Sequence, residues 1–216
     1  MAIDREKRLA AEAAAELVED GMLVGLGTGS TVAFLLPALA ARALTLRCVA
    51  TSPATERAAR GLGLPVEPFS GAGALPRLDI AIDGADQVAA DGWVVKGGGG
   101  AHTREKVVAA AADRFVVIVS SDKLVERLAP PVPLELLKYG LAATLGRLGA
   151  VRIRDAPPSP DGNVIADYIG DVGDPAELAT RLAATPGVVE HGLFPAAMVA
   201  EIVIGRGDRV EVRRAG

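Results

Sequence analysis

Short runs of small aliphatic residues alternate with helix-forming segments through the first 120 residues of the chain. These runs predict buried strands at 22–26, 44–50, 78–82 and 115–119. Two shorter strands are predicted at 64–69, interrupted by prolines, and at 93–95, leading into Lys96. Helices are predicted at 3–19, 32–43, 54–60 and 104–112. Strands that alternate with helices favour a doubly wound, mostly parallel, Rossmann-like α/β sheet, in which ligands bind beyond the carboxyl ends of the strands.

The order of elements changes after Pro130, Pro131 and Pro133. Strands are predicted there at 134–137, 151–155, 163–169 and 188–194, and helices at 139–148 and 175–184. The order β-α-β-β-α-β is that of a ferredoxin-like arrangement. A last hairpin, 202–205 and 209–213, is expected to return to the first sheet. We therefore predict a Rossmann-like domain of residues 1–129 and 203–216, and a smaller ferredoxin-like α+β domain of residues 130–202.

Composition excludes several classes of function. The 216 residues carry a formal net charge of −4, which argues against nucleic acid as a partner. Cys48, the single cysteine, lies in an apolar run and is expected to be a buried hydrophobe, and one cysteine with two separated histidines cannot build a zinc cluster. The N-terminal segment lacks the apolar core of a signal peptide, and no uncharged run is long enough for a bilayer. We expect a cytoplasmic protein that makes no membrane contact and holds no metal or cofactor.

A glycine loop, Gly27-Thr28-Gly29-Ser30-Thr31, follows the first strand. It fails the dinucleotide fingerprint because Ser30 stands at the third glycine position, and it lacks the lysine of a phosphate-binding Walker loop. A helix cap with turn glycines is the simpler interpretation, but one cap needs one hydroxyl and the loop has three. The loop is therefore a candidate phosphate- or hydroxyl-binding segment.

Charge and glycine concentrate between residues 83 and 106. Asp83-Gly84-Ala85-Asp86 follows a buried strand, and Lys96-Gly97-Gly98-Gly99-Gly100 precedes Thr103-Arg104-Glu105-Lys106. The first segment is also a plausible turn, but two carboxylates on one turn repel and need a cation, for which Lys96 is the nearest candidate. Carboxylates spaced in this way suit the hydroxyls of a sugar.

Glu105 is the candidate base. Acids in a first helical turn are common because they oppose the helix dipole, and the same dipole keeps a base deprotonated. After a glycine loop that admits substrate to the backbone, such a carboxylate can take a proton from carbon. Lys96, Lys123 and Lys7 are the candidate cations for a phosphate, although each alone is more often a solvated lysine. Lys96 and Lys123 are expected to lie with the Thr28 loop and Asp83 beyond the carboxyl ends of the parallel strands.

Together these motifs resemble ribose-5-phosphate isomerase, type A, over nearly the whole chain. The resemblance rests on Val24–Thr31, Asp83–Asp86, Lys96–Gly99 and Thr103–Lys106, with Asp161-Gly162-Asn163 and the segments Pro186–Val189 and Gly192–Phe194 in the second half. It implies interconversion of ribose 5-phosphate and ribulose 5-phosphate through an enediol without a metal. It also implies a homodimer or homotetramer.

The resemblance assigns roles residue by residue. Glu105 matches the proton-transferring base, and Asp83, Asp86 and Lys96 match residues that bind the sugar, open its ring and stabilise the enediolate. The remaining substrate-binding positions would be Thr28, Gly29, Ser30, Thr31, Gly84, Ala85, Gly97, Gly98, Gly99 and Lys123, with Lys7 the weakest member. The sequence departs from the family at Gln87, where an acid is usual, at Gly100 and His102, and at Pro133-Leu134-Glu135.

Three alternatives remain from the sequence alone. An amino-sugar-phosphate isomerase would need a catalytic histidine arrangement that His102 and His191 hardly supply, and a coenzyme A transferase shares the broad architecture. A non-enzymatic sugar-phosphate sensor would carry a basic DNA-binding module, for which the chain has neither length nor charge.

Overall fold

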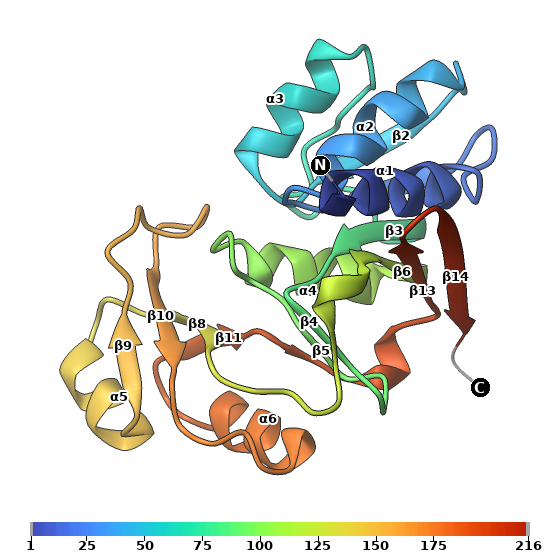
Figure 1. Ribbon diagram of the computed structural model, residues 1–216. Coiled ribbons are helices and arrows are strands. Elements are labelled where there is room, and N and C mark those ends of the chain that lie inside the picture. Colours follow the sequence, from blue (N-terminus) through green and yellow to red (C-terminus); the bar gives the residue numbers. More distant parts are fainter. Residues whose placement is uncertain (1, 215–216) are drawn as a thin grey trace. The chain divides into compact units, whose positions relative to one another are not determined.

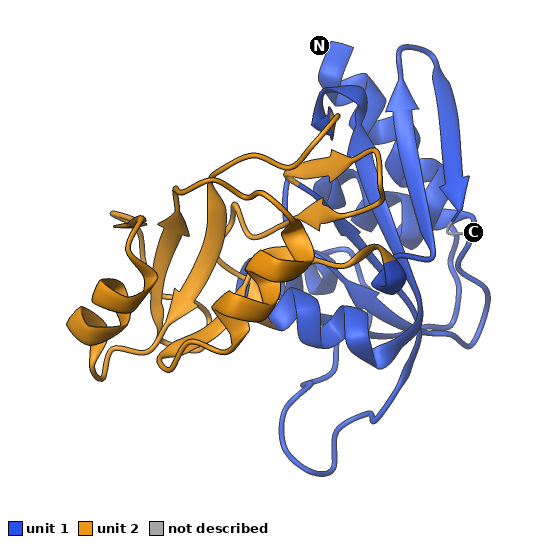
Figure 2. Cartoon of the chain, turned by 90° about the horizontal axis from the view of Figure 1, so that it is seen from below, with its two compact units in different colours: residues 1–85, 104–124, 197–216 blue, residues 86–103, 125–196 orange. Residues whose placement is uncertain are grey.

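The computed structural model describes residues 2–214. Residues 1, 215 and 216, which the predicted larger domain includes, lie outside the described part. The chain divides into two compact units, coloured separately in Figure 2. Unit 1 comprises 1–85, 104–124 and 197–216, and unit 2 comprises 86–103 and 125–196. The domain limits predicted at 130 and 202 stay a prediction, because compactness groups residues without defining what folds independently.

Unit 1 is built on a six-stranded sheet of order β14-β13-β6-β3-β1-β2 (Figure 1). The strands are β1 (Leu23–Leu26), β2 (Arg47–Ala50), β3 (Leu78–Gly84), β6 (Ala112–Ser120), β13 (Glu201–Arg206) and β14 (Arg209–Arg214). All neighbours pair in parallel except β13 and β14. The predicted parallel sheet and the return of the last hairpin to it are both confirmed.

Helices cover both faces of this sheet. Alternate strand residues such as Val24 and Ile80 join a core with α1 (Ala2–Ala15) and α2 (Val32–Ala41). The residues between them face the other way, where Gly25 lies against Val108 of α4 (His102–Ala111). Figure 1 shows α1 and α4 on opposite sides of β3 and β6. This is the doubly wound arrangement that the sequence predicts.

Helix starts follow the local sequence. Ser52 caps α3 (Pro53–Gly61) by accepting a hydrogen bond from the Thr55 N–H, and Asp174 caps α6 (Pro175–Ala183) through the N–H groups of residues 176 and 177. A proline follows each cap at the first helical position, where no N–H is needed. The predicted bounds of both helices are therefore nearly right.

Unit 2 contains an antiparallel sheet of order β11-β8-β10-β9. Its strands and helices follow one another as β8 (Val132–Leu136), α5 (Leu141–Leu148), β9 (Val151–Ile153), β10 (Val164–Tyr168), α6 and β11 (Val188–His191). The first and third strands are central, as the ferredoxin-like order requires. A core of aliphatic side chains including Leu134, Leu148 and Leu182 lies between this sheet and its helices.

A third sheet, of order β12-β5-β4-β7, was not predicted. It consists of β4 (Gln87–Ala89), β5 (Val94–Val95), β7 (Leu124–Val125) and β12 (Leu193–Phe194). Lys96 was expected beyond a strand of the parallel sheet, but it follows β5, which pairs antiparallel with β4 and β12. That expectation was wrong because a two-residue strand carries no signal of its pairing partners.

Two other expectations need correction. The strand predicted at 64–69 is reduced to one bridge between Cys48 and Val66, since Pro65 and Pro68 interrupt it. The prolines before residue 134 were expected to precede the strand, but Pro133 lies inside β8. Its carbonyl accepts from the Gly192 N–H, while the Gly192 carbonyl accepts from the Lys96 N–H, so a missing N–H at Pro133 leaves that carbonyl paired. Within residues 2–214, no helix is long and apolar enough to cross a membrane.

Candidate active site

The carboxyl ends of three adjacent strands carry the candidate residues of unit 1. The Gly27–Thr31 loop follows β1, Asp83 and Gly84 end β3, and the short helix η1 (Ser121–Lys123) follows β6. These strands are parallel neighbours, so their carboxyl ends meet at one edge of the sheet. The structure thus brings together the loop, Asp83 and the Lys123 segment, as the sequence predicts.

Asp83 is buried and fixed by backbone donors. Its Oδ1 accepts from the N–H of Thr28 at 3.0 Å and from the N–H of Gly84 at 2.7 Å. A Cβ at position 27 would lie 2.0 Å from the Asp83 carboxyl, so only glycine lets the β1 loop approach. The first glycine loop therefore serves to hold a carboxylate.

The three hydroxyls of this loop have different surroundings. Thr28 Oγ1 lies 2.8 Å from Thr51 Oγ1 and 3.2 Å from Thr55 Oγ1, which places it in a hydroxyl cluster beside α3. Ser30 is exposed and Thr31 is buried. Thr31 stands at the cap position of α2 without making a side-chain cap hydrogen bond, so the helix-cap interpretation does not account for it.

Glu105 lies in the first turn of α4 and is almost fully buried. A helix N-terminus carries partial positive charge and favours a carboxylate there. A glutamate in the first turn of an ordinary surface helix is exposed. Burial therefore distinguishes Glu105 from a glutamate that only interacts with the helix dipole.

The Lys123 segment is held by contacts to the Asp122 carboxylate. Lys123 Nζ lies 3.5 Å from Asp122 Oδ2, and the Ser120 hydroxyl donates to the same carboxylate. Burial raises the pKa of Asp122, but the Ser120 hydrogen bond and the charge of Lys123 outweigh burial and lower the pKa overall. Asp122 therefore stays ionised and orients Lys123, whose side chain is 35% exposed.

Glu6 is a buried acid that the sequence analysis missed. Its carboxylate accepts from the N–H and the hydroxyl of Ser121, at 2.9 and 2.8 Å, and from the N–H of Gly207 at 2.7 Å. Helical spacing places Lys7 on one face with Ala11, Ala14 and Val18, and Lys7 is only half-buried. The sequence around Glu6 does not indicate that it is buried, because its hydrogen-bond partners lie more than 100 residues later in the chain.

In unit 2, Asp86 and the second glycine loop are in direct contact. The Gly98 N–H donates to Asp86 Oδ2 at 2.7 Å, and a Cβ at position 98 would lie 2.7 Å from Asp86 Oδ1. Lys96, at the start of this loop, is buried, and its Nζ lies 5.6 Å from the centroid of the Phe194 ring. A lysine over an aromatic face gains cation–π stabilisation.

The departures from the expected pattern have structural reasons. Gln87 forms a reciprocal pair with the backbone of Ala129, donating to its carbonyl at 2.7 Å and accepting from its N–H at 2.9 Å. A carboxylate could make only the second of these bonds. His102 is fully buried, with its ring against the place where Gly97 lacks a side chain.

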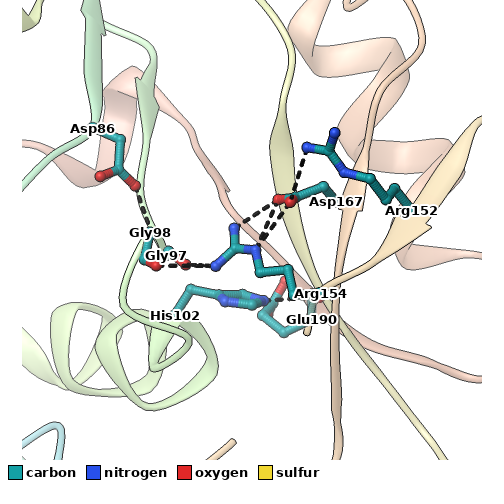
Figure 3. Close-up of polar contacts among 8 residues, drawn as sticks. All are labelled: Asp86, Gly97, Gly98, His102, Arg152, Arg154, Asp167 and Glu190. Carbon is teal, nitrogen blue, oxygen red and sulfur yellow. Dashed lines mark hydrogen bonds and ion pairs between the residues drawn. The ribbon is translucent and has the colours of Figure 1, made fainter. Parts of the chain in front are cut away.

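Glu135 and Arg154 are further residues that sequence reasoning did not single out for the site. Glu135 is fully buried and accepts from the side chains of Thr103, Ser159 (2.6 Å) and Asn163 (2.8 Å). Arg154 donates to the carbonyls of Gly97 and Gly98 (Figure 3). Glu135 lies on β8, and Arg154 directly follows β9. Their contacts with Thr103 and with the glycine loop depend on how the strands pair, which the sequence alone does not show.

Each unit contributes groups that proton transfer to and from carbon uses. Unit 1 has the buried carboxylate of Glu105 at the start of a helix and the Asp83 carboxylate held by backbone N–H groups. Unit 2 has the buried Lys96 and the Asp86 carboxylate held by the Gly98 N–H. Cys48 is not a nucleophile: burial raises the pKa of its thiol to about 12. Among residues 2–214, no three His, Cys, Asp or Glu side chains cluster as metal ligands.

Known proteins share this architecture and sequence. Residues 47–209 match the family described as ribose 5-phosphate isomerase A (phosphoriboisomerase A). A ribose-5-phosphate isomerase A of Natronomonas pharaonis is 44% identical, covering 97% of this chain and 97% of the relative.

Solved structures agree. Ribose 5-phosphate isomerase A from Methanocaldococcus jannaschii has a TM-score of 0.89 at 33% identity, covering 97% of this chain and 98% of the other. A D-ribose-5-phosphate isomerase in complex with phospho-erythronic acid has a TM-score of 0.91 at 30% identity, with both chains fully covered. On sequence and on fold, the chain belongs to the ribose 5-phosphate isomerase A family.

Proposed function

We propose that this chain interconverts D-ribose 5-phosphate and D-ribulose 5-phosphate, the isomerisation of the non-oxidative branch of the pentose phosphate pathway. The observation that carries the proposal is the full-length likeness to isomerases of this name. The reaction moves one proton between C1 and C2 of the open-chain sugar and needs neither an oxidant nor a second substrate.

Glu105 acts as the base in this scheme. Its carboxylate takes the C2 proton of the open-chain aldose, and the electron pair of that bond forms the C1–C2 double bond while negative charge moves to O1. Protonated Glu105 then returns the proton to C1, the O2 hydroxyl proton is transferred to O1, and C2 becomes the carbonyl carbon. Two features support this role: burial keeps bulk water from the carboxylate, and the N-terminus of α4 favours its charged form.

Asp83, Asp86 and Lys96 bind the sugar, assist ring opening and stabilise the enediolate. The carboxylates accept protons from sugar hydroxyls, and Lys96 supplies the positive charge that a developing oxyanion requires. Fixed backbone donors to Asp83 and Asp86 support the proposal, since a carboxylate that cannot rotate keeps a hydroxyl in one position.

The remaining positions bind substrate. These are Thr28, Gly29, Ser30 and Thr31 in the first loop, Gly84 and Ala85 after β3, Gly97, Gly98 and Gly99 in the second loop, and Lys123 with Lys7. The Asp122 carboxylate that orients Lys123 supports a role for this lysine in phosphate binding. For Thr28, the hydroxyl cluster with Thr51 and Thr55 favours binding through the backbone rather than the hydroxyl.

The enzyme is further proposed to act without a metal or cofactor, in the cytoplasm, as a homodimer or homotetramer. Activity that survives dialysis against EDTA supports the first point, and activity restored only by an added divalent ion contradicts it. Light scattering during size-exclusion chromatography measures the oligomeric state, and a monomeric mass contradicts the proposed homodimer or homotetramer.

Isotope exchange tests the activity directly. Ribose 5-phosphate incubated with the protein in D₂O should gain deuterium at C2 and yield ribulose 5-phosphate labelled at C1. Phospho-erythronic acid should compete, because its carboxylate resembles the charged C1–C2 region of the intermediate. Binding of ribose 5-phosphate with neither deuterium incorporation nor formation of ribulose 5-phosphate contradicts the proposal and indicates a sugar-phosphate sensor instead.

A further inference from the structure

Arg154 makes contacts in two directions, and all of its partners lie in unit 2. Its Nε and Nη2 donate to the Asp167 carboxylate over distances of 2.6 to 3.0 Å. Its Nη1 donates to the carbonyls of Gly97 and Gly98, both at 3.0 Å. Figure 3 shows the guanidinium between Asp167 and the glycine loop, with Asp86 on the far side of that loop.

Asp167 fixes the plane of the guanidinium. The carboxylate lies on β10 and is 7% exposed, and the Arg154 side chain is 18% exposed. A guanidinium bound by a carboxylate through two nitrogens has its remaining N–H groups pointing in a set direction, which an ammonium group cannot reproduce. Nη1 is therefore a rigid donor aimed at the loop.

The loop has no side chains of its own, so only backbone hydrogen bonds hold its peptides, among them the Gly100 N–H bond to the Gly97 carbonyl at 3.0 Å and the bonds from Arg154. Gly97 and Gly100 have φ angles of +105° and +73°, and residues 97–100 can fix their peptide planes only through the backbone and its partners. A trans peptide points its C=O and N–H in opposite directions. When Arg154 holds the carbonyls of Gly97 and Gly98, the N–H groups of Gly98 and Gly99 point away from it. The Gly98 N–H then meets Asp86.

We propose that Arg154, held by Asp167, is a positioning residue for the isomerisation: it orients the Gly97–Gly99 peptides and, through the Gly98 N–H, the Asp86 carboxylate. The proposal rests on the proposed function, which assigns Asp86 and this loop to the sugar. Arg154 itself is given no contact with the substrate. A loop whose peptides rotate would bind the sugar in several poses, of which only some place C2 at the base.

A purely structural role is the competing explanation. The Arg154–Asp167 pair could simply join the segment after β9 to β10, since Arg154 lies opposite Ile165, two residue pairs along from Asp167 and on its diagonal. In that case substitution lowers stability, but the protein that remains folded keeps wild-type kinetics.

Arg154→Lys is the first test, and Arg152→Lys is its matched control. Lysine keeps the charge but cannot bind Asp167 and two carbonyls in one plane. Arg152 lies 3.8 Å from the same Asp167 carboxylate with a side chain that is 67% exposed. For Arg154→Lys at a temperature where it is folded, we expect kcat/KM to fall by about 10- to 100-fold, chiefly through kcat, because small misplacements in a site cost about this much. Arg152→Lys should keep both constants.

Amide hydrogen exchange supplies a readout independent of catalysis. Exchange over residues 97–100 should be faster in Arg154→Lys than in Arg152→Lys, while exchange in β10 and α6 is unchanged. If Arg154→Lys does not fold, the double variant Arg154→Gln with Asp167→Asn removes both charges together, so no unpaired buried charge remains. It should show the same kinetic defect.

Wild-type kcat/KM and wild-type loop exchange in either Arg154 variant would overturn the proposal. So would equal kinetic losses in Arg154→Lys and Arg152→Lys. Failure of the proposed function is a separate result: the wild-type protein then has no isomerase activity, and faster loop exchange in Arg154→Lys would still support the geometric role of Arg154.

Discussion

At several positions in this protein, only glycine fits because a side chain packs directly against the backbone. The Asp83 carboxyl occupies the space that a Cβ at position 27 would need, so the first glycine loop and the end of β3 specify each other. The sequence shows the glycines and the aspartate, but it does not show that they touch. The same holds for Gly98 and Asp86.

Gly27→Ala should therefore damage both stability and activity. The added methyl group must displace the Asp83 carboxyl, and overpacking of this kind costs typically about 1–3 kcal/mol in the free energy of unfolding. Gly61→Ala is the control, since a Cβ there meets nothing within 4 Å and φ is not positive. Urea denaturation and steady-state kinetics on both variants measure the effect. Wild-type stability and kcat/KM in Gly27→Ala would contradict this account of the loop.

Cys48 should not react in the native protein. Its thiol is buried and its pKa is raised to about 12, first by burial and then by the charge of Glu67. The thiolate that attacks disulfide reagents is therefore almost absent at neutral pH. An aromatic disulfide reagent should label the protein only after urea unfolding. Stoichiometric labelling of the native enzyme would show that β2 opens readily or that the thiol is exposed.

At the scale of elements, Glu6 joins three segments that are distant in sequence. It lies on α1, accepts from Ser121 in η1 and accepts from Gly207 in the β13–β14 turn. The hydrogen bond from the Gly207 N–H is the main cause that lowers the pKa of Glu6 below its usual value of 4.5, and the Ser121 bonds add to it against burial. Because η1 also carries Lys123, Glu6 supports a candidate phosphate-binding segment.

The pH dependence of stability follows from that direction. A carboxyl with a lower pKa in the folded state contributes stability above its unfolded pKa, and the contribution is lost as pH falls through the folded pKa. Glu6→Gln should therefore destabilise the protein at neutral pH, and the difference from wild type should shrink below about pH 4.5. Glu12→Gln, at an exposed position of the same helix, should show no such trend. Urea midpoints between acid and neutral pH measure all three proteins, and a difference that is constant with pH would contradict the role of Glu6.

Sequence periodicity predicted the elements that are long enough to show it. Strands β1, β3 and β6 and helices α2 and α4 appear where the aliphatic runs and helix formers placed them, within a few residues. Strands β4, β5, β7 and β12 have only two or three residues, so period-two alternation cannot identify their partners. That is why Lys96 was expected at the edge of the parallel sheet. The long predicted strand at 188–194 is divided by Gly192 into β11 and β12, which belong to different sheets.

At the scale of the whole molecule, the sequence predicted the residues proposed to react with substrate, but not the residues that hold them in place. Glu105, Asp83, Asp86 and Lys96 could be proposed because charge beside glycine after a strand is rare in a core. Glu6, Glu135 and Arg154 could not, because each is defined by partners that only the folded chain brings to it. Burial of these charges is informative only when their hydrogen-bond partners are known.

Turnover by Glu105→Gln is the most direct measurement of the central claim. Glu177→Gln is the control, since Glu177 also lies in the first turn of a helix but is exposed. We predict that both variants fold with wild-type circular dichroism. Glu105→Gln should lose about 10²- to 10⁴-fold in kcat for ribose 5-phosphate, with a matching loss of deuterium incorporation at C2, whereas Glu177→Gln keeps wild-type turnover. Near-normal isomerisation by purified Glu105→Gln would contradict the assignment of Glu105 as the base.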